Sequence, residues 1–72
     1  MAQFCERLKF LRNEHNLKQR EMAAELGLAL SSYQAYEYAY RYPDFQGLIA
    51  IADYFDVSLD YLVGRSDVRE RR

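Results

Sequence analysis

The chain has 72 residues, half of them hydrophobic, and its formal net charge is −1. This length allows one small domain, which an apolar core must stabilise because a single cysteine cannot form an intramolecular disulfide. One cysteine and one histidine are too few for a zinc site of the usual ligand count, so we expect no metal and no cofactor. The charge alone gives no reason to expect nucleic acid, although the placement of charges matters more than their sum.

No apolar run reaches the roughly 20 residues that span a bilayer, and the N-terminal MAQFCERLK lacks the layout of a signal peptide. These features predict a cytoplasmic protein with no membrane partner. The chain offers no Ser-His-Asp set, paired catalytic carboxylates or phosphate-binding loop. We therefore expect neither enzymatic activity nor a small-molecule substrate.

The first predicted element is an amphipathic helix from Phe4 to His15. Its apolar residues recur at spacings of four and three: Phe4, Leu8 and Leu11. A second, shorter helix is expected to begin at Gln19, and its apolar face consists of Met22, Ala23 and Leu26. Gly27 follows directly, where a glycine can take the left-handed conformation that ends a helix.

Residues 33–43 read YQAYEYAYRYP, in which tyrosines alternate as they would on one face of a strand. A strand, however, leaves neither face coherently apolar. A helix from about Leu30 to Glu37 instead places Tyr33 and Tyr36 on one face, which we assign to the core. From residue 38 to the chain's only proline no helical period remains, and the residue before a proline favours extended backbone, so a loop is predicted.

A fourth helix is predicted to follow Asp44, whose carboxylate can cap the free N–H groups of a first turn. Its expected buried stripe is Phe45, Leu48, Ile49, Ala52 and Phe55. The stretch DVSLDYLVG predicts a last short helix, capped by Ser58, with Asp60 in its first turn and Gly64 at its end. The remaining RSDVRERR is charged and expected to be frayed. The sequence thus predicts a compact, all-α domain of five helices.

The second and third helices have the spacing of a helix-turn-helix. After Gln19, Ala23 follows at four positions and Gly27 at eight, with Leu28 at nine and Tyr33 at fourteen. Position 23 must hold a small residue such as alanine, because the third helix is expected to cross almost directly over it. The glycine turns the chain, and the tyrosine position fills the angle between the two helices.

From about Phe4 to Asp67 the chain resembles the Cro/repressor (Xre-type) helix-turn-helix family, which has the lambda-repressor-like fold. The resemblance rests on RLKFLR, LKQREMAAELGL, the YE at 36 and 37, Pro43 and IADYFDVSLDYLVGRSD. It implies a DNA-binding domain at residues 1–67, with the helix-turn-helix at about 19–38 and a charged tail at 68–72. In this family the third helix lies in the DNA major groove, and paired subunits bind palindromic operators with half-sites about 34 Å apart.

The resemblance also implies roles for individual residues. Gln19 is expected to contact a phosphate and to brace the third helix, and Arg41 matches a phosphate-binding cation. Arg12 and Glu37 match a buried ion pair that ties the first helix to the end of the third. The other expected DNA-contacting residues are Leu30, Ser31, Ser32, Gln34, Ala35 and Tyr40. Serine hydroxyls can serve several bases, glutamine suits adenine, and the two apolar residues suit thymine methyl groups.

The chain departs from the family pattern in four places. Lys18 and Ala29 stand where a capping serine or threonine is usual, and a lost cap destabilises by about 1 kcal/mol. Tyr38-Ala39 replaces the usual Asn-Gly, and because positive φ is uncommon outside glycine, the third helix is predicted to continue to about Ala39. The base-facing surface is also poor in Arg, Lys, Gln and Asn.

Several alternatives stay open at this point. Tyr38, Tyr40 and Tyr42 suit DNA contact, subunit contact or surface packing equally. Leu62 is assigned to the core, and Leu59 and Val63 to a dimer seam. Three cations near the motif (Lys18, Arg20 and Arg41) are balanced by three glutamates (Glu21, Glu25 and Glu37), so a positive DNA face requires the glutamates to be engaged elsewhere.

We expect a homodimeric, sequence-specific DNA-binding regulator, most simply a repressor. It is either a complete small protein or the N-terminal domain of a longer one. The alternative is a protein–protein interaction module that keeps the fold, has an eroded DNA face and grips its partner with the tyrosine-rich loop.

Overall fold

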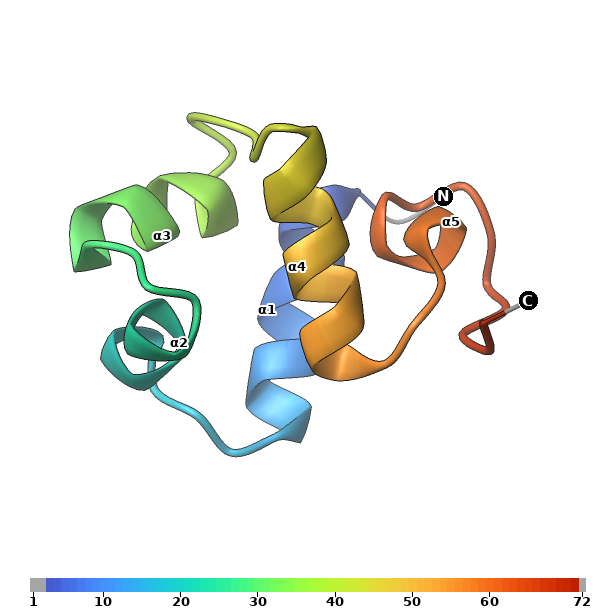
Figure 1. The fold of residues 1–72 in the computed structure, drawn as a ribbon, viewed down its shortest axis with the longest axis horizontal. Coiled ribbons are helices and arrows are strands. Elements are labelled where there is room, and N and C mark those ends of the chain that lie inside the picture. The colour runs from blue at the N-terminus through green and yellow to red at the C-terminus, as the bar shows by residue number, and fades with distance from the viewer. Residues whose placement is uncertain (1–2, 72) are drawn as a thin grey trace.

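A computed structural model describes residues 3–71, and all regular secondary structure in this range is helical (Figure 1). The helices are α1 (Phe4–Glu14), α2 (Gln19–Glu25), α3 (Leu30–Glu37), α4 (Phe45–Phe55) and α5 (Leu59–Leu62). Figure 1 shows α1 and α4 in the middle of the domain, with α2 and α3 on one side and α5 with the C-terminal segment on the other. The predicted all-α, five-helix fold is confirmed. In residues 3–71 no helix is long and apolar enough to cross a membrane.

Every helix contributes to a single core. The buried apolar residues are Phe4, Leu8, Leu11, Met22, Ala23, Tyr33, Ile51, Ala52, Phe55, Val57, Tyr61 and Leu62. Tyr33 is fully buried and Tyr36 packs against the same cluster, so both tyrosines belong to the core as predicted.

The predicted stripe of α4 is wrong at its first residue. Phe45 is 72% exposed, whereas Ile51, which the prediction omitted, is buried. Ile49 is only half-buried. The stripe that faces the core follows the helical spacing of Leu48, Ile51, Ala52 and Phe55, and Phe45 lies in the first turn of the helix, outside the core cluster.

All five helices end in the same way. Shortly after each helix one residue takes a left-handed conformation with positive φ: Asn16, Gly27, Ala39, Asp56 and Gly64. At each end two backbone N–H groups donate to carbonyls of the last turn. At α3 the Ala39 N–H donates to Tyr36 (3.4 Å) and the Tyr40 N–H donates to Ala35 (2.9 Å).

The prediction that the third helix continues to about Ala39 is therefore wrong. The helix stops at Glu37, and Ala39 has a φ of 63°. The hydrogen bonds of this ending form although no glycine is present. Glycine, asparagine and aspartate tolerate the left-handed conformation at the other four ends, whereas alanine is strained in it.

The helix N-termini show both predicted caps, one substitute at Lys18 and no cap at Ala29. The Asp44 carboxylate accepts the Gly47 N–H (2.8 Å), and the Ser58 hydroxyl accepts the Tyr61 N–H (3.0 Å), as predicted. Lys18 has no acceptor to offer α2, but the Glu21 carboxylate accepts the N–H of Lys18 at 2.8 Å. Ala29 makes no side-chain cap at α3.

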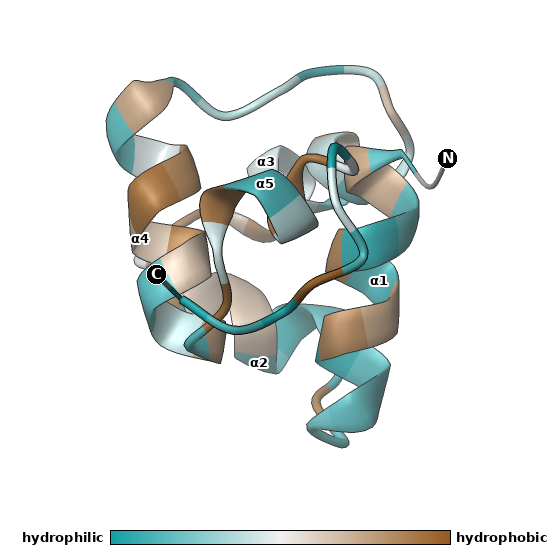
Figure 2. Ribbon diagram, turned by 90° about the vertical axis from the view of Figure 1, so that its right-hand side faces the viewer, coloured by the Kyte–Doolittle hydropathy of each residue, from teal (hydrophilic) through white to brown (hydrophobic). Residues whose placement is uncertain are grey.

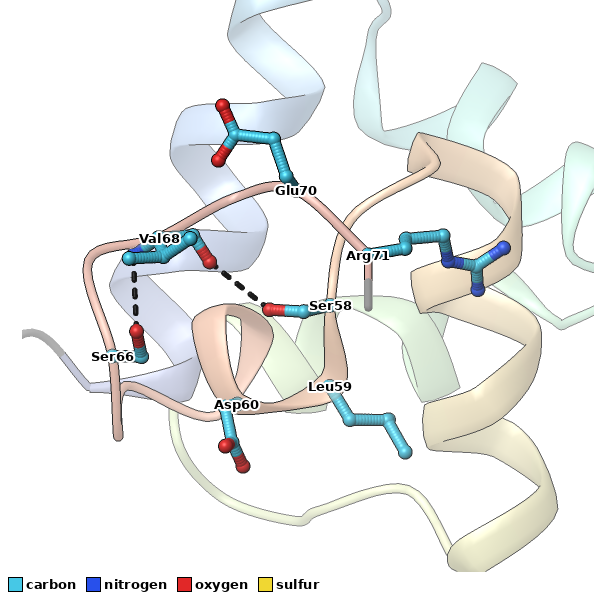
Figure 3. Close-up of a pocket in the computed structure, with 7 residues that line it drawn as sticks. All are labelled: Ser58, Leu59, Asp60, Ser66, Val68, Glu70 and Arg71. Carbon is cyan, nitrogen blue, oxygen red and sulfur yellow. Dashed lines mark hydrogen bonds between the residues drawn. The ribbon is translucent and has the colours of Figure 1, made fainter.

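The prediction that the C-terminal segment is frayed is wrong for residues 65–71. These residues pack against the domain. The Ser58 N–H donates to the Arg69 carbonyl (2.9 Å), and the Ser58 hydroxyl donates to the Val68 carbonyl (3.1 Å). Arg69 pairs with Glu14 of α1 and Arg71 pairs with Asp53 of α4. Figure 2 shows this segment running across the front of the domain from α1 to α4, and Figure 3 shows the contact between Ser58 and Val68.

Arg7 anchors the start of this segment from within α1. It is buried, its guanidinium lies 3.9 Å from the centre of the Tyr61 ring, and it donates to the carbonyls of Tyr61 (3.1 Å) and Ser66 (3.2 Å). It also pairs with Asp67 at 2.7 Å. Burial of the guanidinium is possible because each of these partners satisfies one of its N–H groups or its flat face.

Replacing Ala39 with glycine is expected to raise the free energy of unfolding by about 1 kcal/mol. Glycine adopts positive φ without strain, and this gain is partly offset because glycine loses more conformational entropy on folding than alanine does. Thermal denaturation should show a Tm higher by about 4–8 °C. Ala50→Gly, on the exposed side of α4, is the control and should lower stability by about 1 kcal/mol. Equal losses in both variants would contradict the assigned backbone strain.

Candidate nucleic-acid interface

Helices α2 and α3 pack against each other, and α2 carries one small buried residue next to the turn. Ala23 of α2 is 2% exposed, and its carbonyl accepts the Leu28 N–H (2.8 Å) across the turn. Gly27, with a φ of 70°, makes that turn. Tyr33 of α3 is fully buried and belongs to the same core cluster as Ala23. These contacts form the helix-turn-helix that the spacing predicts.

The residues predicted to face the bases lie on the part of α3 left open by this packing. Ser31 is exposed, and Leu30, Ser32, Gln34 and Ala35 are half-buried. All five lie on α3, and Ser31 is the most exposed of them. The side chains are short or flexible, so the surface of α3 is open to a close approach.

The loop after α3 contains three tyrosines. Tyr38 and Tyr40 lie beside the surface of α3, and Tyr42 lies against α1. The rings of Tyr38 and Tyr40 meet edge to face with centroids 6.3 Å apart. Tyr42 instead packs against Phe4 of α1, with centroids 6.0 Å apart. Tyr40 is 80% exposed, and Arg41 beside it is also exposed.

The carboxylate of Glu37 is the meeting point of α1, α2 and α3. Its side chain is fully buried and accepts from Arg12 Nε (2.5 Å) and Arg12 Nη2 (3.2 Å). It also accepts from the Tyr33 hydroxyl and from Gln19 Nε2 (3.1 Å). Burial by itself would raise the pKa of Glu37, but the hydrogen bonds from Arg12, Tyr33 and Gln19 outweigh burial and lower the pKa. Glu37 is therefore ionised near neutral pH.

Gln19 links this buried carboxylate to the open surface of α3. Its Nε2 donates to Glu37 and also lies 3.3 Å from the Tyr38 hydroxyl, while its Oε1 accepts from Gln34 Nε2 at 3.0 Å. The side chain braces α3 through these contacts. Glu37 holds one N–H, and the Tyr38 hydroxyl lies near both ends of the amide (3.3 Å from Nε2 and 3.5 Å from Oε1), so the phosphate contact predicted for Gln19 would use the second N–H.

The glutamates near the motif are occupied by partners within the chain. Glu37 is buried in the cluster just described, Glu21 accepts the Lys18 N–H, and Glu25 accepts the Tyr54 hydroxyl of α4 (3.1 Å). Lys18, Arg20 and Arg41 are exposed and have no ion pair within residues 3–71. Burial removes the charge of Glu37 from the surface around α2 and α3, whereas Glu21 and Glu25 stay exposed and keep their charge there.

Sequence reasoning missed the part played by Arg7 and Tyr38. Arg7 stands at helical spacing from Phe4 and Leu11, so it lies on the buried stripe of α1, and that periodicity would have revealed it. The Tyr38 hydroxyl contacts the Gln19 amide. This contact depends on the course of the loop after α3, which no pattern in the sequence predicts.

A short helix crossed at a buried alanine by a second helix with an open outer surface defines a helix-turn-helix DNA-binding domain. A sequence model described as helix-turn-helix matches residues 8–62. The chain belongs to this family, in its Cro/repressor type, whose members are DNA-binding transcriptional regulators.

The chain is similar to two Bacillus subtilis proteins. It is 39% identical over 64 residues to the uncharacterized HTH-type transcriptional regulator YobD, covering 89% of this chain and 57% of that protein. It is 47% identical over 60 residues to the uncharacterized HTH-type transcriptional regulator YqaE, covering 83% and 52%.

A phage repressor and a solved structure are also similar. The cryptic phage CTXphi transcriptional repressor RstR of Vibrio cholerae is 42% identical over 60 residues, which cover 83% of this chain and 54% of the repressor. The crystal structure of a transcriptional regulator from Listeria innocua superposes with a TM-score of 0.81 at 39% identity, covering 86% and 58%. The chain spans about half the length of the curated relatives it matches.

Replacing Arg12 with methionine is expected to lower the free energy of unfolding by about 3–5 kcal/mol, because it leaves the Glu37 carboxylate buried without its cation. Chemical denaturation measures this loss. The control is Arg69→Met, which removes the half-exposed pair with Glu14 and should cause a much smaller loss because solvent screens that pair. A loss for Arg12→Met no larger than that of the control would show that the buried pair has no structural role.

Proposed function

We propose that the chain acts as a cytoplasmic, homodimeric and sequence-specific DNA-binding repressor that reads the major groove with α3. The observation that carries the proposal is the open surface of α3 beside the buried crossing at Ala23. An α-helix fits the major groove, where each base pair presents a distinct pattern of donors, acceptors and methyl groups. The similarity to a phage repressor supports repression as the outcome of binding.

Individual residues are assigned by what their side chains can offer. Ser31, Ser32 and Gln34 supply hydrogen-bonding groups to base edges, and Leu30 and Ala35 suit thymine methyl groups. The exposed Tyr40 and Arg41 lie after α3 and suit phosphate oxygens, which fix the position of the helix on the duplex. Gln19 acts by bracing α3, and its phosphate contact stays a prediction.

The surface of α5 suits contact with a second copy of the chain. Leu59 is 40% exposed and Val63 is half-buried, whereas Leu62 is fully buried in the core as predicted. An open hollow of about 620 Å³ beside Leu59 is bordered by Asp60 and Arg71 (Figure 3). Apolar surface flanked by charges of both signs can pair with itself about a two-fold axis.

The position of α5 also suits the geometry of an operator. Helices α3 and α5 lie on opposite sides of a domain that is 30 Å long (Figure 1). Two domains that meet at α5 therefore place their α3 helices toward the two ends of the pair. Half-sites one turn of DNA apart require about 34 Å between them, so the two domains must meet at an angle and not end to end.

The second candidate function is a protein–protein interaction module. The exposed rings of Tyr38 and Tyr40, together with Phe45, favour it, since aromatic residues are enriched at protein interfaces. Such a module would use the loop after α3 to grip a partner and would bind no particular duplex.

Selection of binding sites from random duplexes at low salt is expected to enrich a palindromic motif. Each subunit offers few cations, so the slope of log affinity against log salt should be about 3 or less per subunit. Filter binding of a selected duplex over a salt series measures this slope. Absence of any enriched motif would favour the interaction module over the repressor.

Replacing Leu59 with glutamate is expected to convert a dimer to a monomer, because it puts a charge into the apolar seam. Sedimentation with and without a selected duplex reports subunit number and DNA binding together. Phe45→Glu, at an exposed apolar residue of α4, is the matched control and should stay dimeric. A Leu59→Glu protein that sediments as the control does would exclude α5 as the seam.

A further inference from the structure

We propose that a pocket between the turn of the helix-turn-helix and α4 binds a small monocarboxylate with an apolar body. The pocket has a volume of about 320 Å³, near the lower end of the range for small-molecule sites, which is about 300–1,000 Å³. None of the five residues of α3 assigned to base edges lines it. Binding at this pocket is therefore a property separate from the reading of DNA.

The walls of the pocket are mostly apolar and come from three elements. Leu26 and Leu28 lie at the turn between α2 and α3, Tyr36 comes from α3, and Ala50 and Ile51 come from α4. Ile51 belongs to the buried core, and the leucines and the tyrosine pack against that core. An apolar ligand placed here leaves water for a surface that the domain itself covers only in part, which is favourable.

These walls are held in place without a ligand. The Leu28 N–H donates to the Ala23 carbonyl at 2.8 Å, which fixes the turn. Tyr42, which lines the pocket from the loop after α3, packs its ring against Phe4 of α1. The pocket is thus largely formed in advance, as small-molecule sites usually are.

One cation borders this apolar pocket. Arg41 is exposed, and its guanidinium makes no ion pair within residues 3–71. Its backbone N–H donates to the Ala35 carbonyl at 3.3 Å, which keeps it close to the end of α3. A guanidinium matches a carboxylate in shape and can donate two parallel hydrogen bonds to it. A ligand with a carboxylate at one end and an apolar body at the other therefore suits the pocket.

A second charged residue limits the charge of the ligand. Asp44 also lines the pocket, and its carboxylate is kept at the start of α4 by the Gly47 N–H, which it accepts at 2.8 Å. One cation beside one acid favours a ligand with a single negative charge. A dicarboxylate or a phosphate would bring a second negative charge toward Asp44 and would lack the apolar body.

Occupation of the pocket is expected to oppose DNA binding. The proposed function assigns Arg41 to a DNA phosphate, and a guanidinium that pairs with a bound carboxylate is less available to that phosphate. By linkage, each ligand then weakens the affinity for the other by the same factor. This effect on DNA rests on the proposed function, whereas the binding of the acid does not.

Binding is tested with phenylpropionate, added to the full chain at constant sodium concentration and followed by NMR chemical shifts. Saturable shifts are expected at Leu28, Tyr36 and Ile51, with a dissociation constant of about 1 mM for so small a ligand. Phenylpropionamide lacks the charge and succinate carries two charges without an apolar end. Both are expected to bind about tenfold more weakly.

Three variants assign the shifts to this pocket. Arg41→Met removes the charge and should weaken phenylpropionate binding about tenfold. Ala50→Leu adds apolar atoms to the pocket at an exposed position of α4 where leucine suits a helix, and it should abolish saturable binding. Arg20→Met, which removes an exposed cation of α2 outside the pocket, is the matched control and should bind phenylpropionate as the wild type does.

Several results would overturn the site. These are a wild type without saturable shifts, an amide or succinate that binds as tightly as phenylpropionate, and an Arg41→Met or Ala50→Leu variant that binds as the control does. None of these measurements involves DNA. Selection of duplexes without any motif would overturn the proposed function and leave the site intact.

The effect on DNA is measured by filter binding of a selected duplex with phenylpropionate at about ten times its dissociation constant. The wild type and Arg20→Met are expected to lose about fivefold in duplex affinity, within the usual range of coupling between two sites. Arg41→Met should bind the duplex more weakly from the start and lose nothing further. An unchanged wild-type affinity would overturn the coupling to DNA.

Discussion

The arrangement of the first three helices depends on one buried carboxylate. Glu37 ends α3, Arg12 comes from α1 and Gln19 begins α2, so their hydrogen bonds meet where the three helices converge. Removing a carboxylate from water is unfavourable unless charged and polar partners replace the lost solvent. Glu37 has a guanidinium, an amide and the Tyr33 hydroxyl as partners, and no buried side-chain polar atom in the described chain lacks one. Apolar packing allows the helices to approach, and this cluster fixes their angular placement.

The same cluster removes one negative charge from the surface near α2 and α3, in a chain whose net charge is −1. Glu37 is enclosed, and the other two glutamates near the motif, Glu21 and Glu25, accept hydrogen bonds from the chain itself. The cations of this region stay at the surface. Much of the remaining charge lies at the far end of the domain, where Arg69 and Arg71 pair with acids of α1 and α4. The sum of charges therefore says little about the field near α3.

The sequence predicts the elements of this fold well because each helix has an apolar stripe, a start signal or a stop signal of its own. It predicts less where distant segments decide the outcome. Nothing local in RSDVRERR shows that Arg7, more than fifty residues away, will hold this segment against α5. Nor does the type of residue at 39 show that the chain will turn there. Two backbone hydrogen bonds and the packing of the next residues impose a left-handed conformation that alanine does not favour. At the site, the residues of α3 follow from the spacing, but the link through Gln19 to Gln34 requires coordinates.

This link changes what counts as the reading surface. Side chains that face DNA are commonly considered one by one, each with its own set of donors and acceptors. An amide is different, because its two ends are interchangeable until a neighbour fixes them. Here the neighbour is itself an amide, and its orientation is fixed by a carboxylate that no DNA can reach. The buried cluster that stabilises the domain therefore also orients the Gln34 amide at the surface of α3.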